Sequence, residues 1–375
     1  MSLPVASSRA LPEGTATSPV AVALIGVGYW GPKLARTLAA LPECGPLICC
    51  DADPQRLEPL AAELPQAELT TSAEAVLADP SVEAVVIATP AASHFDMAQK
   101  ALMAGKHVLV EKPLATGSLC AARLMLLAQA RGLVLAAGHV YLHHPAVEAL
   151  ARLLAQGALG EVRYISGLRA SLGPRAREDV DVVWDYLIHD VYILQYLLGR
   201  LPTAVRATGR AYLRPRLADV VFAEMRYGPN VIAHCQASWY HPEKVRRLVV
   251  VGSRRMAVLD EAAEHPLLVF DSGYAPFEGT DEHGNRGLRL YDGAPVAPQL
   301  EKGQPLEREC RDFLRAVRGG GRPRADGRSA LSVIRVLEAL EASLVADGAL
   351  VPLPIERAGR GNGSALVKER QEIAV

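Results

Sequence analysis

The sequence predicts an α/β protein with an N-terminal, doubly wound parallel sheet and a C-terminal α/β domain that has a large open, mainly antiparallel sheet. Its 375 residues exceed the length of one ordinary domain. In the first part, short uninterrupted apolar runs alternate with helical stretches, which is typical of parallel strands covered on both faces. In the second part, longer strands alternate apolar and polar residues, which is typical of a sheet with one covered face.

The N-terminal domain is expected to span residues 20–140, after a disordered tail at 1–19. Its strands are runs of Val, Ile and Ala without alternation, such as Glu-Ala-Val-Val-Ile-Ala at 83–88. Helical stretches separate these runs, so each strand–helix–strand unit can place its strands in parallel. Strands are predicted at 20–27, 47–50, 83–88, 106–110 and 133–137, and helices at 32–41, 54–63, 94–104 and 118–131.

The C-terminal domain is expected over residues 141–356, before a loose tail at 357–375. Turn signals at Gly228-Pro229 and Gly252-Ser253 separate strands that alternate apolar and polar residues. The last helix has a capping residue on each side, Asp326 before it and Gly348 after it. Strands are predicted at 161–169, 204–213, 220–227, 230–238 and 246–251, and helices at 145–156, 184–198, 306–317 and 329–346.

Charge and cysteine usage exclude several classes of protein. The 40 Lys and Arg residues nearly balance the 41 Asp and Glu residues, which argues against a nucleic-acid partner. No apolar stretch reaches the roughly 20 residues of a membrane helix, and the N-terminus lacks the apolar core of a signal peptide. Six cysteines without a C-x-x-C pair are typical of a reduced cytoplasmic protein. The sequence therefore predicts a cytoplasmic protein with no membrane partner and no metal site.

The sharpest motif is a glycine-rich turn between the first strand and the first helix. It reads Gly26-Val-Gly28-Tyr-Trp-Gly31-Pro32, the G-x-G-x-x-G pattern of a dinucleotide-binding Rossmann fold. Gly26 permits a tight turn, Gly28 lets a pyrophosphate approach the backbone, and Gly31 lets the helix pack against the strand. Pro32 suits the first helical turn, whose unpaired N–H groups favour a diphosphate.

Asp51 indicates which dinucleotide binds. It ends the second strand, 20 positions after Gly31, where a carboxylate can accept hydrogen bonds from ribose hydroxyls. A carboxylate there repels the 2′-phosphate of NADP, so NAD is the predicted cofactor. Arg56 lies close enough in sequence to leave NADP open.

Three further groups of residues can carry chemistry. Thr89-Pro90 with His94 and Glu111-Lys112 follow two strands of the predicted parallel sheet, at the carboxyl edge where ligands bind. A lysine beside a nicotinamide can orient a hydroxyl and favour its ionised form. Asp185 and His189 are spaced i, i+4 on a predicted helix, as expected of a carboxylate that orients a general base.

In this order, the glycine turn, Glu111-Lys112-Pro113 and Trp184-Asp185 with His189-Asp190 resemble the Gfo/Idh/MocA family of nicotinamide-dependent oxidoreductases. The likeness runs from about residue 20 to residue 354, and the segment 182–190 looks most like members that act on nucleotide-linked sugars. It implies hydride transfer at a carbinol, with Lys112 and His189 at the reacting hydroxyl. Leu187 and Ile188 depart from the small residue and proline that usually precede this histidine, which would change the helix entry.

The combined reading is an NAD-dependent dehydrogenase or reductase of a sugar, nucleotide-linked by resemblance. His189 would accept the hydroxyl proton, Lys112 would polarise that hydroxyl, and Asp185 would hold His189 or bind a neighbouring hydroxyl. Inositol or free-aldose dehydrogenation stays open as an alternative, as does a non-catalytic NAD(H)-binding sensor. The predicted cofactor-binding residues are Gly26, Gly28, Tyr29, Trp30, Gly31, Asp51, Thr89, Pro90, His94, Glu111 and Lys112.

Two predictions concern the substrate's phosphates and the subunits. Arg169, Arg175 and Arg177 lie on a strand end and the loop before Trp184, where guanidinium groups could bind the diphosphate of a nucleotide sugar. The strands from 204 to 251 are expected to leave one sheet face uncovered by the chain's own helices. Broad apolar faces of that kind mark subunit interfaces, so a homodimer or homotetramer is expected.

Overall fold

The computed structural model describes residues 18–172, 179–280, 282–284 and 286–354. Arg175, Arg177 and most of both predicted tails lie outside these ranges. The chain divides into two compact units. The first comprises the residues up to Leu114 together with Ala122–Gly138 and Gln304–Gly327, and the second comprises Ala115–Ala121, His139–Gly303 and the chain from Arg328 on. The predicted fold class, with a parallel sheet in one part and a mainly antiparallel sheet in the other, is confirmed.

The first unit contains a six-stranded parallel sheet in the order β3-β2-β1-β4-β5-β6. The strand order reverses between β1 and β4, which is the switch point where ligands bind in such sheets. The strands are β1 Val20–Ile25, β2 Cys44–Cys50, β3 Glu68–Thr70, β4 Ala84–Ile87, β5 His107–Glu111 and β6 Leu135–Gly138. The helices are α1 Gly31–Ala40, α2 Pro54–Glu63, α3 Ala73–Ala78, α4 His94–Met103 and α5 Ser118–Arg131, of which α5 begins in the second unit.

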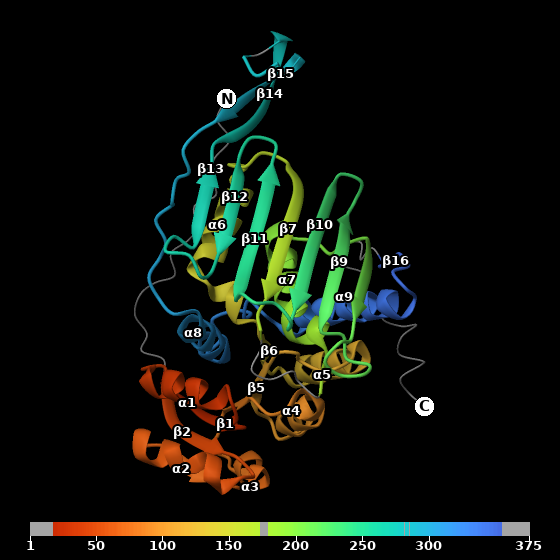
Figure 1. The fold of residues 1–375 in the computed structure, drawn as a ribbon. Coiled ribbons are helices and arrows are strands. Elements are labelled where there is room, and N and C mark those ends of the chain that lie inside the picture. The colour runs from red at the N-terminus through yellow and green to blue at the C-terminus, as the bar shows by residue number, and fades with distance from the viewer. Residues whose placement is uncertain (1–17, 173–178, 281, 285, 355–375) are drawn as a thin grey trace. The chain divides into compact units, whose positions relative to one another are not determined.

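Helix α8, Pro305–Val317, returns to this unit late in the chain and lies beside α1 (Figure 1). Its apolar face contributes Cys310, Phe313 and Leu314 to the same core as Leu34 and Leu38 of α1. The sequence prediction placed residues 304–327 in the second domain, and the structure corrects this. The reason is that the apolar face of α8 packs in the same core cluster as the apolar face of α1.

The second unit contains an eight-stranded sheet in the order β13-β12-β11-β7-β10-β9-β8-β16. Helices α6, α7 and α9 lie on one face of it (Figure 1). These helices are α6 Pro145–Ala155, α7 Ile188–Leu198 and α9 Gly327–Val345. The strands are β7 Val162–Ala170, β8 Ala204–Arg210, β9 Val220–Tyr227, β10 Val231–Ser238, β11 Val245–Gly252, β12 Met256–Asp260, β13 Leu267–Phe270 and β16 Val351–Pro352.

One pair in this sheet differs from the others. Strands β7 and β10 run parallel, whereas each other neighbouring pair is antiparallel. The carboxyl ends of β7 and β10 are therefore adjacent, with Ala170 opposite Ser238. This edge positions the candidate residues of the second unit.

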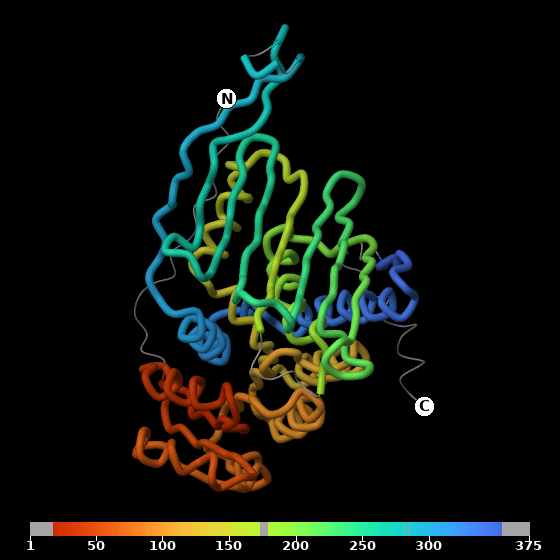
Figure 2. The backbone as a smooth tube through the Cα atoms, in the orientation of Figure 1, coloured from red at the N-terminus to blue at the C-terminus, as the bar shows by residue number. Residues whose placement is uncertain are grey.

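A separate two-stranded ribbon, β14 Ser272–Thr280 and β15 Arg286–Asp292, extends from the sheet of the second unit (Figure 2). Its strands are exposed along most of their length. Within the parts of the chain that the structure describes, no helix combines the length and apolar character needed to cross a bilayer.

Candidate active site

The glycine turn has the geometry that a dinucleotide requires. A side chain at Gly26 would press against the backbone of Ala88 and Thr89 in the neighbouring strand connection, at 2.6–2.7 Å, and Gly26 has a φ of +100°. A side chain at Gly31 would overlap the carbonyl oxygen of Gly26. A side chain at Gly28, by contrast, would meet Arg56 Nη1 at 3.8 Å, an ordinary van der Waals distance, so the backbone there is not crowded by other backbone atoms. The residues present therefore fit a pyrophosphate at the N-terminus of α1.

Asp51 follows β2 at the same carboxyl edge. Its two carboxylate oxygens accept hydrogen bonds from the backbone N–H groups of Val27, at 2.7 Å, and Asp53, at 2.9 Å. The carboxylate is thus tied to the glycine turn. Arg56 Nη1 lies 3.8 Å from Asp51 Oδ2, so a cation accompanies the carboxylate at the position where a ribose would bind.

Tyr29 and Trp30 differ in exposure. Tyr29 is 79% exposed at the turn, whereas Trp30 is half-buried and packs against the core. The ammonium group of Lys33 lies 4.9 Å from the ring centre of Tyr29 and 4.4 Å from that of Trp30. Tyr29 is therefore the more accessible of the two predicted cofactor contacts.

The side chain of His94 lies between two loops of the first unit. The side chain is buried, with Nδ1 2.7 Å from the carbonyl oxygen of Pro113 and Nε2 2.8 Å from that of Thr89. It joins the loop after β4 to the loop after β5. Both ring nitrogens of His94 are engaged by the two loops, and its contact with the cofactor stays a prediction.

Lys112 follows β5 and is half-buried. Its backbone N–H donates to Glu111 Oε2 at 3.2 Å. Glu309 of α8 is fully buried near Glu111, and among the described residues neither of its carboxylate oxygens has a hydrogen-bond partner. Burial and the charge of Glu111 hold the pKa of Glu309 well above its usual range. Sequence reasoning missed Glu309, because its place near the Glu-Lys-Pro motif depends on α8 returning to the first unit.

In the second unit, the chain before α7 forms a π-helical turn, Val183–Leu187. Asp181 Oδ1 caps this turn by accepting from the backbone N–H groups of Val183, at 2.9 Å, and Trp184, at 3.3 Å. Burial raises the pKa of Asp181 to about 6, although the two backbone donors oppose the shift. The predicted helix at 184–198 thus begins as a π-turn and becomes an α-helix at Ile188.

The π-turn is bound to the ends of both parallel strands. Asp185 Oδ2 accepts from Trp239 Nε1 at 3.0 Å, and Trp239 follows β10. The hydroxyl of Tyr186 lies 2.7 Å from the hydroxyl of Ser171, which follows β7. These bonds position Asp185 at the carboxyl edge of the parallel pair.

His189 begins α7 and has a partner that the sequence analysis did not name. Its Nδ1 lies 2.6 Å from the hydroxyl oxygen of Tyr192. Its ring meets the ring of Tyr141 edge-on, with centres 4.9 Å apart. The signal for Tyr192 is its i, i+3 spacing from His189, which places both side chains on one helix face.

Arg169 lies in a buried ion-pair network, and its contact with the diphosphate of a substrate stays a prediction. Its side chain is 4% exposed. Its guanidinium contacts Asp190, at 3.3 Å, and Glu261, at 3.2 Å, and lies 4.7 Å from the ring centre of Tyr141. The two carboxylates compensate its charge inside the second unit. Arg175, which the sequence analysis also predicted to bind the diphosphate, lies outside the described residues.

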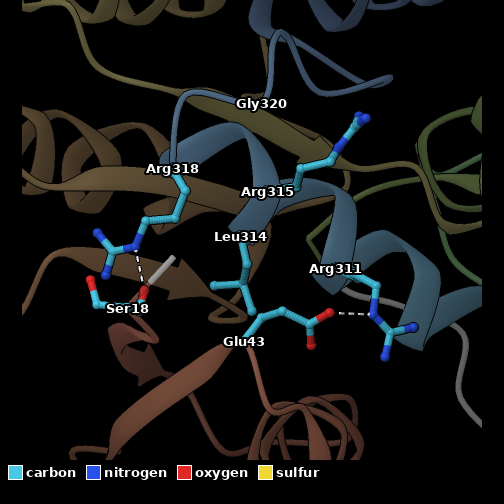
Figure 3. Close-up of a pocket in the computed structure, with 7 residues that line it drawn as sticks. All are labelled: Ser18, Glu43, Arg311, Leu314, Arg315, Arg318 and Gly320. Atoms are coloured by element: carbon cyan, nitrogen blue, oxygen red, sulfur yellow. Dashed lines mark hydrogen bonds and ion pairs between the residues drawn. The ribbon is translucent and has the colours of Figure 1, made fainter. Parts of the chain in front are cut away.

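A cavity of about 270 Å³ in the first unit holds none of the motif residues (Figure 3). Three arginines of α8 and its C-terminal end line it, but carboxylates already engage each of them. Arg311 binds Glu43, Arg315 binds Asp312, and Arg318 binds Glu83. The cavity is therefore not a candidate for the anionic cofactor.

Comparisons with known proteins agree with this arrangement. Residues 20–139 match an oxidoreductase family with an NAD-binding Rossmann fold, and residues 147–258 match the GFO/IDH/MocA C-terminal domain. UDP-N-acetylglucosamine 3-dehydrogenase from Acidithiobacillus ferrooxidans is 34% identical over 295 residues, which are 78% of this chain and 87% of that protein.

Two solved structures are similar over most of the chain. That of UDP-N-acetylglucosamine 3-dehydrogenase GnnA from Acidithiobacillus ferrooxidans has a TM-score of 0.72 and 32% identity, and covers 87% of this chain and 97% of that chain. That of GenD2 from gentamicin A biosynthesis, in complex with NAD, has a TM-score of 0.76 and 26% identity, and covers 92% and 99%. With both domains matched and the glycine turn built for a dinucleotide, the chain belongs to the Gfo/Idh/MocA family of NAD-binding oxidoreductases.

Proposed function

We propose that the protein interconverts a carbinol and a carbonyl of a nucleotide-linked sugar, with NAD as its cofactor. The observation that carries the proposal lies on one sheet edge of the first unit. The uncrowded glycine turn at Gly28 follows β1, and Lys112 follows β5, two strands away at the same carboxyl edge. A diphosphate anchor and a cation at one edge are what a nicotinamide-dependent dehydrogenase needs.

NAD, when bound, supplies the carbon that exchanges hydride with the substrate. The chain's residues supply position and proton transfer. The turn at Gly26, Gly28 and Gly31 binds the diphosphate, and Asp51 accepts hydrogen bonds from ribose hydroxyls. Lys112 donates to the substrate hydroxyl oxygen, and its positive charge favours the ionised form of that hydroxyl.

His189 is the proposed proton acceptor, and Asp185 binds a hydroxyl next to the reacting one. Asp185 is well suited to this because Trp239 fixes one of its carboxylate oxygens. The same residues serve the reverse reaction, in which His189 returns the proton to the carbonyl oxygen.

The proposal that the substrate is a nucleotide-linked sugar is based on a similar protein, whose name states that it acts on UDP-N-acetylglucosamine. Inositol or free-aldose oxidation is the alternative within the same chemistry, and a non-catalytic NAD(H) sensor is the alternative outside it. The cytoplasmic location and the homodimeric or homotetrameric state stay predictions.

A substrate panel tests the proposal. Purified protein and NAD are incubated with UDP- and dTDP-sugars, free aldoses and inositols, and NADH absorbance and product mass are measured. Turnover of a nucleotide sugar, with a product two mass units lighter, supports the proposal. Turnover of inositols or free aldoses alone selects the alternative substrate class. Tight NAD(H) binding without turnover of any compound selects the sensor.

A further inference from the structure

We infer that Tyr192 is a positioning residue that holds His189 in the tautomer with its proton on Nδ1, so that Nε2 takes the substrate proton. The inference rests on the proposed function, because it assigns His189 as the base. It adds the residue that decides which ring nitrogen can act.

The hydrogen bond between the two side chains is short and lies within one helix. Tyr192 Oη lies 2.6 Å from His189 Nδ1, and both residues belong to α7, three positions apart. Tyr192 is 1% exposed. The backbone N–H of Tyr141 donates to the same hydroxyl oxygen at 3.4 Å, so this oxygen is held from a second direction.

Aromatic rings hold the orientation of both side chains. The ring of Tyr192 stacks on His139, with centres 4.3 Å apart and planes 15° apart. Tyr141 meets His189 edge-on at 86°, and the guanidinium of Arg169 lies over the Tyr141 ring. Arg169 is in turn held by buried carboxylates, so rotation of His189 would disturb several packed groups.

The protonation state follows from the chemistry of imidazole. A neutral ring carries one N–H, so a base that uses Nε2 must carry its hydrogen on Nδ1. That N–H then donates to Tyr192 Oη. When the substrate O–H bond breaks, its proton forms the Nε2–H bond, and the Nδ1–H bond to Tyr192 stays in place. Tyr192 does not transfer a proton itself. Its hydroxyl oxygen stabilises the imidazolium of His189 by accepting the hydrogen bond from Nδ1–H.

The titratable and charged groups around this pair come from several elements of the second unit. They are His139 and Tyr141 before α6, Asp185 and Tyr186 on the π-turn, Asp190 on α7, Arg169 on β7, Arg246 on β11, and Glu261 after β12. They are retained in the variants below, so a change in pH dependence reports the loss of the Tyr192 hydroxyl.

The first test uses NMR on the wild-type protein labelled with ¹⁵N-histidine. At a pH where His189 is neutral, its ¹⁵N shifts should show hydrogen on Nδ1, with His189→Ala used to assign the signal. Hydrogen on Nε2 in the wild type would overturn the inference. This measurement needs no turnover and no variant at position 192.

The second test is Tyr192→Phe, which keeps the stacked ring and removes the oxygen. We expect kcat for oxidation to fall by about 10- to 100-fold, the effect of one hydrogen bond to a charged group. The acid limb of the kcat–pH profile should move to lower pH, because the imidazolium loses its acceptor. KM for NAD should not change. Tyr227→Phe, at another fully buried tyrosine at the end of β9, is the matched control and should leave the profile unchanged.

Different results would contradict the inference about Tyr192 and the proposed role of His189. If Tyr192→Phe keeps the wild-type rate and profile while His189→Ala loses the acid limb, the inference is wrong and the proposed base stands. If His189→Ala also keeps the limb, the assignment of His189 as base in the proposed function is wrong.

Discussion

Lys112 and His189 make separable contributions in the proposed reaction. General acid–base catalysis is worth about 10²–10⁴-fold in rate, so His189→Ala should lower kcat by about that factor and leave NAD binding intact. Lys112→Ala should be at least as damaging, because it removes a hydroxyl ligand and a positive charge. The wild-type rate of oxidation should fall on the acid side, because a protonated His189 cannot accept the hydroxyl proton. A His189→Ala variant that keeps this limb and most of the rate would place the base elsewhere.

Substitutions of Gly28 and Gly31 in the turn should have different effects. Gly28→Val should abolish NAD binding by calorimetry with little change in melting temperature, since only Arg56 Nη1 lies near the added carbon. Gly31→Ala should instead lower the melting temperature, because its side chain overlaps the carbonyl oxygen of Gly26. Unchanged NAD affinity in Gly28→Val would show that the diphosphate binds elsewhere.

Asp51 and Arg56 together should set the cofactor preference. Asp51→Ser removes the charge that repels a 2′-phosphate and leaves Arg56, 3.8 Å away, to bind it. We expect the ratio of kcat/KM for NAD to that for NADP to fall at least tenfold. The double variant Asp51→Ser/Arg56→Ala is the control and should regain less NADP activity. A wild-type enzyme that strongly prefers NADP would contradict the interpretation of Asp51.

Local sequence patterns predicted those residues whose role is set by their neighbours along the chain. The glycines and Asp51 belong to one strand–turn–helix–strand unit, so their spacing carries the geometry. The contacts of Arg169 and His94 could not be predicted from local patterns because their partners are remote: Glu261 lies 92 positions from Arg169, and Pro113 lies 19 positions from His94. Tyr192 was missed because three-residue spacing on an apolar helix is common in packed cores.

At the level of elements, the capped π-turn should make stability depend on pH through Asp181. Its folded pKa of about 6 is higher than the ordinary carboxyl value of about 3.9. The folded state therefore binds more protons than the unfolded state between about pH 4 and 6. Stability falls as pH rises through this window and stays lower above it.

Asp181→Asn should remove this part of the decline while keeping an oxygen for the N–H groups of Val183 and Trp184. In urea titrations, the free energy of unfolding of the variant relative to that of wild type should rise by about 1–3 kcal/mol as the pH rises from 4 to 7.5. Asp181→Ala, which also loses the cap, should be less stable than Asp181→Asn at every pH. Parallel stability curves for wild type and Asp181→Asn would show that this carboxyl does not titrate in the window. Burial and, less strongly, the charge of Asp181 raise the pKa of Glu341, so the titration of Glu341 should be followed in both variants.

Several helices and strands were predicted closely from the local sequence, whereas elements set by tertiary contacts were not. The helices at 54–63 and 118–131 and the strand at 220–227 match the structure residue for residue. The prediction omitted β3, α3, β12–β15 and β16, which are short or exposed and so lack a clear apolar period. The π-turn could not be predicted, because no periodicity distinguishes one wide turn from the start of an α-helix.

At the level of the whole molecule, the first unit is not continuous along the chain, because residues 304–327 belong to it although they follow most of the second unit. A sequence pattern assigns a helix to the domain that surrounds it along the chain, and α8 has strands of the second unit before it. Its amphipathic face is readable, but the partner of that face is not, because α1 lies more than 260 residues earlier. Assignment of α8 therefore required the three-dimensional contacts.

The open face of the eight-stranded sheet should be a subunit interface. Tyr164, Phe222 and Ile232 are 43–51% exposed on neighbouring strands β7, β9 and β10, on the side away from the covering helices. Ile232 lies opposite Tyr164, so these two side chains form one apolar patch, whereas Phe222 lies opposite Gln236, four residues further along β10. Such patches on soluble proteins mark protein–protein contacts, and most homo-oligomers repeat one patch about a two-fold axis.

Light scattering at micromolar concentration should therefore give two or four times the chain mass of 40.1 kDa. The double variant Phe222→Asp/Ile232→Asp should shift the mass toward the monomer, because burying two carboxylates in the contact costs more than the contact gains. Its sheet should stay folded, since both side chains are exposed in the single chain. Met103→Asp, at an equally exposed apolar residue of α4, should leave the mass unchanged. A wild-type mass near 40.1 kDa would contradict the interface, and an unchanged oligomer in the double variant would place it on another face.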